Sequence, residues 1–466
     1  MAFTPERLLH ALNECLDGAD SPPPAALCVA LSGGLDSTVL LASLGRLRSD
    51  GRLALPVRAL HVDHGLHPQS PGWAAACRDL ARSLAVDLQE IRVDARAAPG
   101  ESPEAAARSA RYAALKARLA PGEVLLTAHH ADDQLETILL QWLRGGGLRA
   151  VAGMARRARF GPGWHVRPLL GFARDDLRAW AGLSELGWQE DPSNLDSRFD
   201  RNYLRLEVLP AIRRRWPAAA RTAGRVAEYA ADALELEDVL AEQDLRVVAV
   251  GAALSLERLQ TLGDARQRSV LRAWLRRSGM PPPSAMTLGA LRRDMAVAAA
   301  DRIPQVGWPG AVVRRYRGHL YGEAPQADRF VTGPWQPRGP HSFDLGGGAA
   351  LELVADVGQG LSQARLPEVL DVVTRKEGDS FRPAAGAHRR PLRKWFQERG
   401  VLPWRRDAIP MLCSTRRIVA VADICCAAEF AAAADEPSWR VCWHGRPLLT
   451  EDETFAFNWP EHPPIL

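Results

Sequence analysis

Apolar and polar positions follow two different periods along the first half of the chain. Short apolar runs of strand length are followed by longer stretches in which apolar residues recur every three to four positions, the spacing of a helix with one buried face. Strands that alternate with helices in this way favour a parallel, doubly wound sheet. The predicted strands are 26–31, 57–62, 87–93 and 123–128, and the predicted helices are 37–47, 71–84, 102–119 and 132–143.

The second half of the chain carries a different pattern. Helical spacing continues from about residue 218 to 293, and short β-like runs at 349–354 and 418–421 follow, with one helix near 391–399. The sequence therefore predicts an α/β protein, in which a doubly wound, mainly parallel sheet forms the N-terminal domain. A helical middle domain and a small α+β C-terminal domain come after it. The predicted bounds are 1–217, 218–325, a linker at 326–345, and 346–466.

Composition narrows the class of protein. A chain of 466 residues is longer than a single domain with one hydrophobic core usually is, so more than one domain is expected. A content of 47% hydrophobic and 24% charged residues is typical of a globular protein. No apolar run approaches the ~20 residues that a membrane span needs, and the first 16 residues lack a signal-peptide core. Seven cysteines without CxxC spacing indicate neither a disulfide framework nor a zinc site. A cytoplasmic location is the prediction.

The net charge is only +4, but the chain contains two strongly basic stretches. Residues 198–225 hold eight arginines against two acids, and residues 375–406 hold ten Lys/Arg against three acids. Two such stretches far apart indicate a long phosphate backbone that is gripped at separate points. A solvated surface is the alternative for either stretch alone.

A glycine turn joins the first predicted strand to the first predicted helix. Adjacent glycines let a ligand approach the backbone, and the first N–H groups of the helix then point at it. The turn predicts an anion cradle for phosphate, distinct from a Walker loop or a Rossmann fingerprint. An ordinary strand–turn–helix is the alternative. The candidate phosphate-binding residues are Ser32, Gly33, Gly34, Leu35, Asp36 and Ser37.

The predicted helix 132–143 carries two carboxylates three residues apart, Asp133 and Glu136. This spacing makes them neighbours beside the apolar face, which is expected to be buried. Such a pair suits Mg²⁺ or an ammonium group, although acids in a first turn also simply complement the helix dipole. The residues predicted to form the apolar face are Leu135, Ile138, Leu139 and Trp142.

Two further groups of residues accompany the carboxylates. His129 and His130 precede them with no structural need visible in the sequence, and Arg108 and Arg111 share one face of helix 102–119. Arginine forks match phosphates or carboxylates, but a solvated helix surface is the alternative. Because segments 32–37, 61–67 and 129–136 all follow strand C-termini, we expect them to face one crevice.

Taken together, the motifs resemble those of bacterial tRNA(Ile)-lysidine synthetases, a family of the PP-loop ATP pyrophosphatase superfamily. The resemblance covers the full chain and is weakest between residues 218 and 340. The motifs that carry it are SGGLDS (32–37), HVDHGLH (61–67), EAAARSARY (104–112), HHADDQLET (129–137), EDPSNLDSRFDRNYLR (190–205) and KEGDSFRP (376–383).

The resemblance implies a carbon–nitrogen ligase with ATP as substrate. ATP would adenylate the wobble cytidine of the CAU-anticodon isoleucine tRNA, and free L-lysine would then displace AMP to form lysidine. Residues 32–37 would bind ATP, with Asp36 as a Mg²⁺ ligand. By the same likeness His129, Asp133, Glu136 and Arg108 would line the lysine and adenylate site, and Arg205 would support it.

In this scheme Asp133 and Glu136 would bind the ammonium group of lysine, and one of them would act as base. The resemblance implies no membrane partner and allows a homodimer. Two alternatives are a PP-loop enzyme that thiolates tRNA, and a non-catalytic RNA-binding protein with a relict nucleotide fold. The first usually needs a CxxC pair or a catalytic cysteine near the crevice.

Overall fold

The structure is a computed structural model that describes residues 2–17, 23–63, 65, 69–94, 96, 103–190, 192, 196–298, 302–324, 330–337, 341–384, 388–447 and 449. The chain divides into two compact units, the first running to Glu237 and the second beginning at Asp238. No helix among the described residues is both long and apolar enough to cross a membrane. The predicted domain bounds stay predictions.

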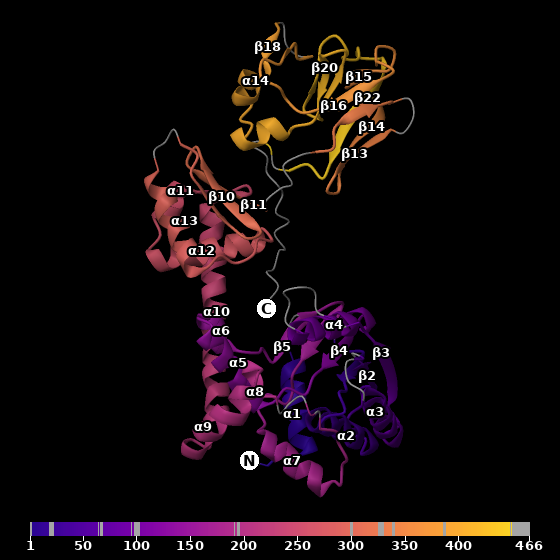
Figure 1. Ribbon diagram of the computed structural model, residues 1–466, viewed down its shortest axis with the longest axis vertical. Coiled ribbons are helices and arrows are strands. Elements are labelled where there is room, and N and C mark those ends of the chain that lie inside the picture. Colours follow the sequence, from indigo (N-terminus) through magenta and orange to yellow (C-terminus); the bar gives the residue numbers. More distant parts are fainter. Residues whose placement is uncertain are drawn as a thin grey trace. The chain divides into compact units, whose positions relative to one another are not determined.

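A six-stranded sheet forms the centre of the first unit, in the order β3-β2-β1-β4-β6-β5 (Figure 1). All neighbours pair in parallel except β5 and β6, which form an antiparallel hairpin at one edge. The predicted mainly parallel sheet is therefore confirmed, although the edge hairpin was not predicted. The strands are β1 (Ala26–Ala30), β2 (Val57–Asp63), β3 (Asp87–Arg92), β4 (Glu123–Leu126), β5 (Arg157–Phe160) and β6 (Gly163–Val166).

Helices cover both faces of this sheet. Leu27 and Val29 of β1 pack into a cluster with α1, α2, α3 and α7, while Cys28 between them packs with Leu115 of α4 on the other face. Alternate side chains of a strand point to opposite faces, so a strand buried on both sides reads as a continuous apolar run. These helices are α1 (Pro5–Leu16), α2 (Leu35–Ser49), α3 (Ser70–Ser83), α4 (Pro103–Arg118), α5 (Ala131–Leu143) and α7 (Arg174–Leu183).

The rest of the first unit is helical. A π-helical turn at 204–208 joins α8 to α9, and such turns often occur at functional sites. Trp216 and Pro217 separate α9 from the long helix α10. The remaining helices are α6 (Leu148–Ala152), α8 (Asp200–Tyr203), α9 (Leu209–Arg215) and α10 (Ala219–Val248), of which α10 continues into the second unit.

The second unit begins with the predicted helices and adds a sheet that was not predicted. This antiparallel sheet has the order β7-β8-β11-β10-β9 and packs against α12 and α13. Its strands are only two to six residues long, which leaves little periodic signal in the sequence. The elements are β7 (Ala249–Val250), β8 (Ala253–Ser255), α11 (Leu256–Gln260), α12 (Asp264–Arg277), α13 (Ala285–Val297), β9 (Gln305–Trp308), β10 (Ala311–Tyr316) and β11 (His319–Glu323).

Antiparallel sheets form the C-terminal part of the second unit. Their orders are β12-β16-β19-β20-β21 and β13-β14-β22-β15, with β17 and β18 as a separate pair beside α14. The elements are β12 (Gly333–Trp335), β13 (Ser342–Gly346), β14 (Ala349–Val357), β15 (Leu361–Ser362), β16 (Leu370–Val373), β17 (Ser380–Phe381), β18 (Arg390–Pro391), α14 (Leu392–Glu398), a 3₁₀ turn (Pro403–Ala408), β19 (Met411–Ser414), β20 (Arg417–Val421), β21 (Cys425–Cys426) and β22 (Pro437–His444).

A cluster of charged residues connects the sheet of β7–β11 to the C-terminal part of the second unit. The carboxylate of Glu323 on β11 accepts hydrogen bonds from Trp404 Nε1 at 2.7 Å and from Arg314 at 3.0 Å. Arg405, which is almost fully buried, approaches the same carboxylate at 2.9 Å. A buried arginine needs such a partner, so this cluster ties the 3₁₀ turn to β11.

Candidate active site

Residues 32–37 form a tight turn between β1 and α2. The hydroxyl oxygens of Ser32 and Ser37 are 3.0 Å apart, and Ser37 donates to the carbonyl oxygen of Gly34 at 3.1 Å. Helix α2 begins at Leu35 without a side-chain cap, so its first N–H groups lack partners within the helix. These groups and the helix dipole make the turn an anion-binding site.

Gly33 adopts a backbone that other residues rarely reach. Its φ is +82°, and a Cβ atom there would lie 3.0 Å from the sulfur of Cys77. Its carbonyl oxygen accepts a hydrogen bond from the N–H of Gln189 at 2.9 Å. The side chain of Cys77 and the backbone of Gln189 therefore both contact the turn at Gly33. The positive φ and the close packing at this position both require glycine.

Asp36, in the first turn of α2, has an oxygen with no hydrogen bond. Oδ1 is buried and bonds to none of the described residues, although Arg174 Nε lies 3.8 Å away. An unsatisfied carboxylate oxygen beside an anion cradle fits Mg²⁺, which is often held by one carboxylate and substrate phosphates. Over the described part of the chain no three His, Cys, Asp or Glu side chains cluster as metal ligands.

His130 connects Asp36 to the carboxylates of α5. Its Nε2 lies 3.6 Å from Asp36 Oδ2 and 3.3 Å from Asp133 Oδ2. Its Nδ1 accepts the N–H of Asp133, and Asp133 accepts the N–H of His130, so the two residues cap α5 reciprocally. His130 thus has a structural role that the sequence analysis missed. Burial opposes a charge on the ring, but Asp133 and Asp36 raise the pKa of His130.

The two carboxylates of α5 are paired with arginines from a distant segment. Arg201 Nε donates to Glu136 at 2.8 Å, and Arg201 also donates to Asp133 at 3.0 Å. Arg205 makes two hydrogen bonds to Glu136, at 2.8 and 2.9 Å, and a longer one to Asp133 at 3.3 Å. Glu136 is only 1% exposed and Asp133 9% exposed, so the pair lies in the interior. Bidentate arginines neutralise two charges that could not be buried alone.

The surroundings of Asp133 keep it ionised. Burial by itself would raise its pKa, but His130 and the positive charge of Arg201 lower the pKa of Asp133 to about 2. A carboxylate with such a pKa binds a proton poorly near neutrality. Asp133 is therefore suited to hold a cation and unsuited to act as a base in this arrangement.

His129, which is half-buried, is linked through Thr127 to His165. The hydroxyl oxygen of Thr127 lies 2.8 Å from His129 Nδ1 and 2.8 Å from His165 Nε2. Burial, together with the nearby charges of Arg167 and Arg108, lowers the pKa of both histidines to about 3. Both rings are therefore neutral at physiological pH and can position ligands without adding charge.

These two histidines predict a pH dependence of stability. Their folded pKa of about 3 lies below the unfolded value of about 6.5, so the unfolded chain binds more protons between these values. The free energy of unfolding should therefore fall as the pH decreases from 6.5, by up to about 1.4 kcal/mol per pH unit for each histidine. Urea unfolding at pH 7, 6 and 5 measures this slope.

His129→Gln should reduce that slope, whereas His10→Gln should leave it unchanged. His10 is an exposed histidine on α1 and serves as the matched control. A slope that is the same in wild type and His129→Gln would contradict the neutral state of His129.

Arg108 and Arg111 project from α4 toward this network. Their guanidinium carbons lie 5.1 and 5.6 Å from the ring of Tyr112, within cation–π range. Burial, with Arg108 and Arg201 nearby, lowers the pKa of Arg111. Neither Arg108 nor Arg111 forms an ion pair with any carboxylate of the described ranges, so both can receive an anion.

The structure brings together most of the candidate residues that the sequence indicates. Asp36, Asp133, Glu136 and Arg205 form one connected network through His130, which joins the turn after β1 to the segment after β4. His129 lies beside this network, linked to His165. In segment 61–67, His61 is buried against the carbonyl oxygen of Leu31, while residues 64, 66 and 67 lie outside the described residues.

Sequence reasoning missed Arg201, His165 and Asp132 as members of the site. Arg201 and Arg205 are four residues apart on a helix, so their side chains share one face, as do the two acids three residues apart that they bind. This spacing could have indicated from the sequence that the two arginines pair with the two acids. Asp132 accepts the N–H of Arg174 at 2.8 Å and pairs with Arg213. His165 lies on β6, a strand that was not predicted, so no pattern singled it out.

The apolar face of α5 is less buried than predicted. Leu135 is in the core, but Ile138 and Leu139 are half-buried and Trp142 is 62% exposed. The expectation that all four are buried is therefore wrong. The reason is that α9 and α10 cover only the first turns of this face, through Leu209 and Ala220.

Three family models match successive parts of the chain. A PP-loop domain matches residues 6–212, a TilS substrate binding domain matches 254–321, and a TilS substrate C-terminal domain matches 370–443. A solved U34-tRNA thiolase, NcsA from Methanococcus maripaludis, is 14% identical with a TM-score of 0.40, over 48% of this chain and 78% of its own.

Curated relatives match the chain almost from end to end, and each is named tRNA(Ile)-lysidine synthase. The protein from Alkalilimnicola ehrlichii is 42% identical over 95% of this chain and 98% of its own. That from Methylococcus capsulatus is 40% identical over 90% and 97%, and that from Coxiella burnetii is 36% identical over 94% and 96%.

Proposed function

The chain belongs to the tRNA(Ile)-lysidine synthase family, and from this membership we propose how its residues divide the reaction. The enzyme is a ligase that forms a carbon–nitrogen bond at carbon 2 of the wobble cytidine in the CAU-anticodon isoleucine tRNA, and the product is lysidine. The modified anticodon reads AUA instead of AUG. The observation that carries this function is the near-complete alignment with these relatives, which spans the PP-loop domain and both TilS domains.

In the first step, oxygen 2 of the cytidine attacks the α-phosphorus of ATP, and pyrophosphate leaves. We assign the phosphates to the turn at Ser32–Ser37, because its free N–H groups and the start of α2 favour anions. Asp36 would hold Mg²⁺ through its unsatisfied Oδ1. When bound, Mg²⁺ neutralises charge on the phosphate oxygens. Arg108 would bind an anionic group of the lysine or of the adenylate.

In the second step, the ε-amine of lysine attacks carbon 2, loses a proton, and AMP leaves. We propose that Asp133 attracts the ammonium group, since it stays ionised beside His130. We assign the role of proton acceptor to the other carboxylate of the pair, Glu136. Both carboxylates are already bonded to Arg201 and Arg205, so the ammonium group must displace at least one guanidinium. Arg205 would support the site by holding Glu136, and neutral His129 would position the adenylate.

The thiolation alternative finds little support in the cysteines. Burial raises the pKa of Cys28 and Cys77 to about 12, although Cys77 packs directly against the glycine turn. Reactive cysteines need the opposite, a lowered pKa and access to substrate. A relict fold without catalysis would have no reason to keep Asp133 and Glu136 buried at a cost.

Further proposals concern the surroundings of the enzyme. The arginines and lysines of stretches 198–225 and 375–406 that are not paired with acids of the protein would contact the phosphates of the tRNA, the second stretch on the acceptor side. We propose a cytoplasmic location, where tRNA is available. The oligomeric state, for which the sequence analysis allowed a homodimer, stays a prediction.

The decisive test offers the purified protein ATP, Mg²⁺, radiolabelled lysine and a CAU-anticodon isoleucine tRNA transcript. We expect label in the tRNA with one pyrophosphate released for each lysine. A transcript with a guanosine in place of the wobble cytidine is the control and should take up no label. Sulfur transfer, or no transfer at all, would overturn the proposal.

A further inference from the structure

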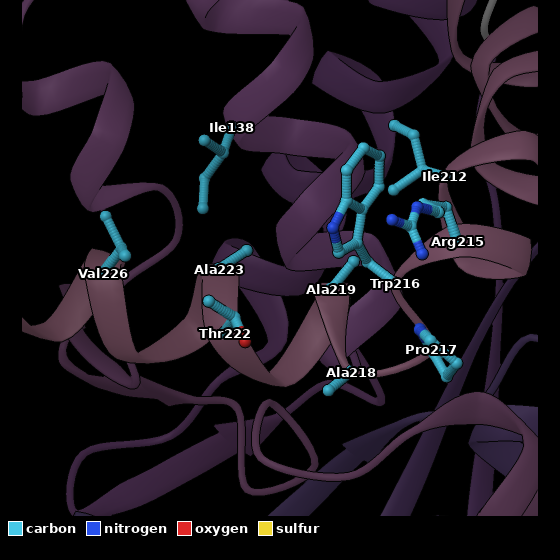
Figure 2. A pocket seen from close by; sticks show the side chains of 10 residues that line it. All are labelled: Ile138, Ile212, Arg215, Trp216, Pro217, Ala218, Ala219, Thr222, Ala223 and Val226. Atoms are coloured by element: carbon cyan, nitrogen blue, oxygen red, sulfur yellow. The ribbon is translucent and has the colours of Figure 1, made fainter.

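A cavity of about 640 Å³ lies in the first unit, outside the network of Asp36, Asp133 and Glu136. Residues of α5, α9 and the first turns of α10 line it, and nearly all of them are apolar. Its volume is in the range of about 300–1,000 Å³ that is typical of small-molecule sites. We call it the Trp216 pocket. Figure 2 shows the indole ring of Trp216, which follows α9, between Ile138 and Ile212.

Trp216 is placed to offer a ring face to a ligand. It ends α9 directly before Pro217, and its side chain is 62% exposed although tryptophan is usually largely buried. The part of the lining that α10 supplies is mostly small, with Ala219, Thr222 and Ala223 at helical spacing. A flat ring can therefore lie between the indole and α10. Exposed tryptophans of this kind serve as stacking platforms for unpaired bases.

Charge around the pocket favours a polyanion. Arg215 lines the pocket, is exposed, and forms no ion pair with a residue that the structure describes. Arg214, Arg221 and Arg225 of the same stretch are also exposed but do not line the pocket, and Arg213 is paired with Asp132. An unpaired arginine in the wall of an apolar pocket suits a ligand with a flat apolar ring and a neighbouring phosphate. A protein partner would need acidic groups as well as an apolar side chain to satisfy the same surface.

The Trp216 pocket is rigidly connected to the active site. Asp133 and Glu136 project from one face of α5, while Ile138, two residues further on, lies on the opposite face and lines the pocket. The pocket and the carboxylates are thus separated by about one helix diameter, about 10–12 Å. The pair Arg213–Asp132 and the packing of Leu209 against α5 hold α9 in place.

We propose that the Trp216 pocket receives a base of the tRNA anticodon loop close to the reacting cytidine, stacked on Trp216, while the exposed arginines contact the adjacent phosphates. This inference rests on the proposed function, since it assigns a further part of the same substrate. Loop bases are recognised when they are splayed out of their stack, and a base held here would fix the cytidine on the other side of α5. Trp216 is then a specificity and positioning residue.

The test uses the full-length protein and a series of anticodon stem-loops, each with 2-aminopurine at one loop position. Stacking on an indole quenches this fluorophore, so we expect quenching on binding at one position near the cytidine. Trp216→Ala should abolish the quenching and weaken binding about 5- to 150-fold, the range for loss of one base–aromatic stack. Trp216→Phe should retain most of the affinity. The matched control is Leu183→Ala, which removes an 87% exposed apolar side chain from α7 and should change nothing.

An RNA variant keeps the test independent of the folding of the protein variant. A stem-loop that lacks the base at the quenched position should bind wild type as weakly as the complete loop binds Trp216→Ala, with no further loss when both changes are combined. Arg215→Ala should weaken binding and reduce the salt slope of log K by about one. Additive losses, or no quenching at any loop position, would overturn the proposal.

Two outcomes separate this proposal from the function on which it rests. If wild type incorporates lysine and Trp216→Ala does so with unchanged KM for tRNA, the pocket proposal fails and the function stands. If wild type quenches the fluorophore but transfers no lysine, the pocket holds RNA and the proposed function fails. A changed oligomeric state of Trp216→Ala with unchanged RNA affinity would assign the pocket to contacts between copies and overturn the proposal.

Discussion

Asp36→Asn is expected to abolish measurable pyrophosphate release while tRNA binding stays nearly intact. The substitution keeps the size of the side chain but removes the charge that would hold Mg²⁺ at the phosphates. A metal that stabilises developing phosphate charge contributes several kcal/mol, so the rate should fall by about 10²–10³-fold. A pyrophosphate release assay with the tRNA transcript, beside a filter-binding measurement of tRNA affinity, separates chemistry from binding.

Asp50→Asn is the matched control for this variant. Asp50 follows the other end of α2 and is exposed, so its neutralisation should leave the rate unchanged. A thermal unfolding curve of Asp36→Asn controls for the lost contact with His130. If Asp36→Asn releases pyrophosphate within about tenfold of wild type, Asp36 does not hold an essential metal, and the proposed role is wrong.

Glu136→Gln should have the largest combined effect on stability and on lysine transfer. Two half-buried guanidinium groups, of Arg201 and Arg205, would lose their main charge partner. Breaking a buried pair by removing one member costs about 3–5 kcal/mol, and the partial exposure of the arginines places this case near 3 kcal/mol. Lysine incorporation should fall by at least about 10²-fold, because the proton acceptor is lost, while pyrophosphate release continues.

Urea unfolding and a two-step assay measure these effects separately. Glu207→Gln neutralises an exposed acid on the same π-helical turn as Arg205 and should alter neither. The double variant Glu136→Gln/Arg201→Met should recover part of the lost stability, since one unpaired guanidinium is removed. Stability equal to wild type would contradict the buried ion pairs. Full lysine incorporation would contradict the role of Glu136 in the second step.

The parallel sheet and its helices could be predicted because their signals are local. The strands expected at 26–31 and 57–62 correspond to β1 and β2 within one residue at each end, and helix 132–143 corresponds to α5. In each of these segments the apolar residues follow one spacing, that of a strand or that of a helix, and the spacing stops at the end of the segment. The sheet of β7–β11 escaped prediction because its strands are short and lie between helices. The hairpin of β5 and β6 escaped for the same reason.

The candidate site was predictable only in part. Asp36, Asp133 and Glu136 stand in motifs whose spacing already indicates their chemistry. The arginines that neutralise these acids lie 65 to 72 residues further along the chain, and only their own four-residue spacing hints at a partner. His130 was misread, since its capping of α5 depends on backbone geometry. The exposure of Trp142 depends on how far α9 and α10 cover α5.

By itself, the sequence of this protein determined the order of the first four strands and of the helices that follow them, the glycine turn at 32–37 and the paired acids of α5. These features follow from periodicity, from the φ that only glycine adopts readily, and from helical spacing, all of which act over a few residues. Only the tertiary structure decided which charges are paired, which histidines are neutral and where the Trp216 pocket opens. Burial and electrostatic pairing depend on segments that folding brings together from far apart in the chain.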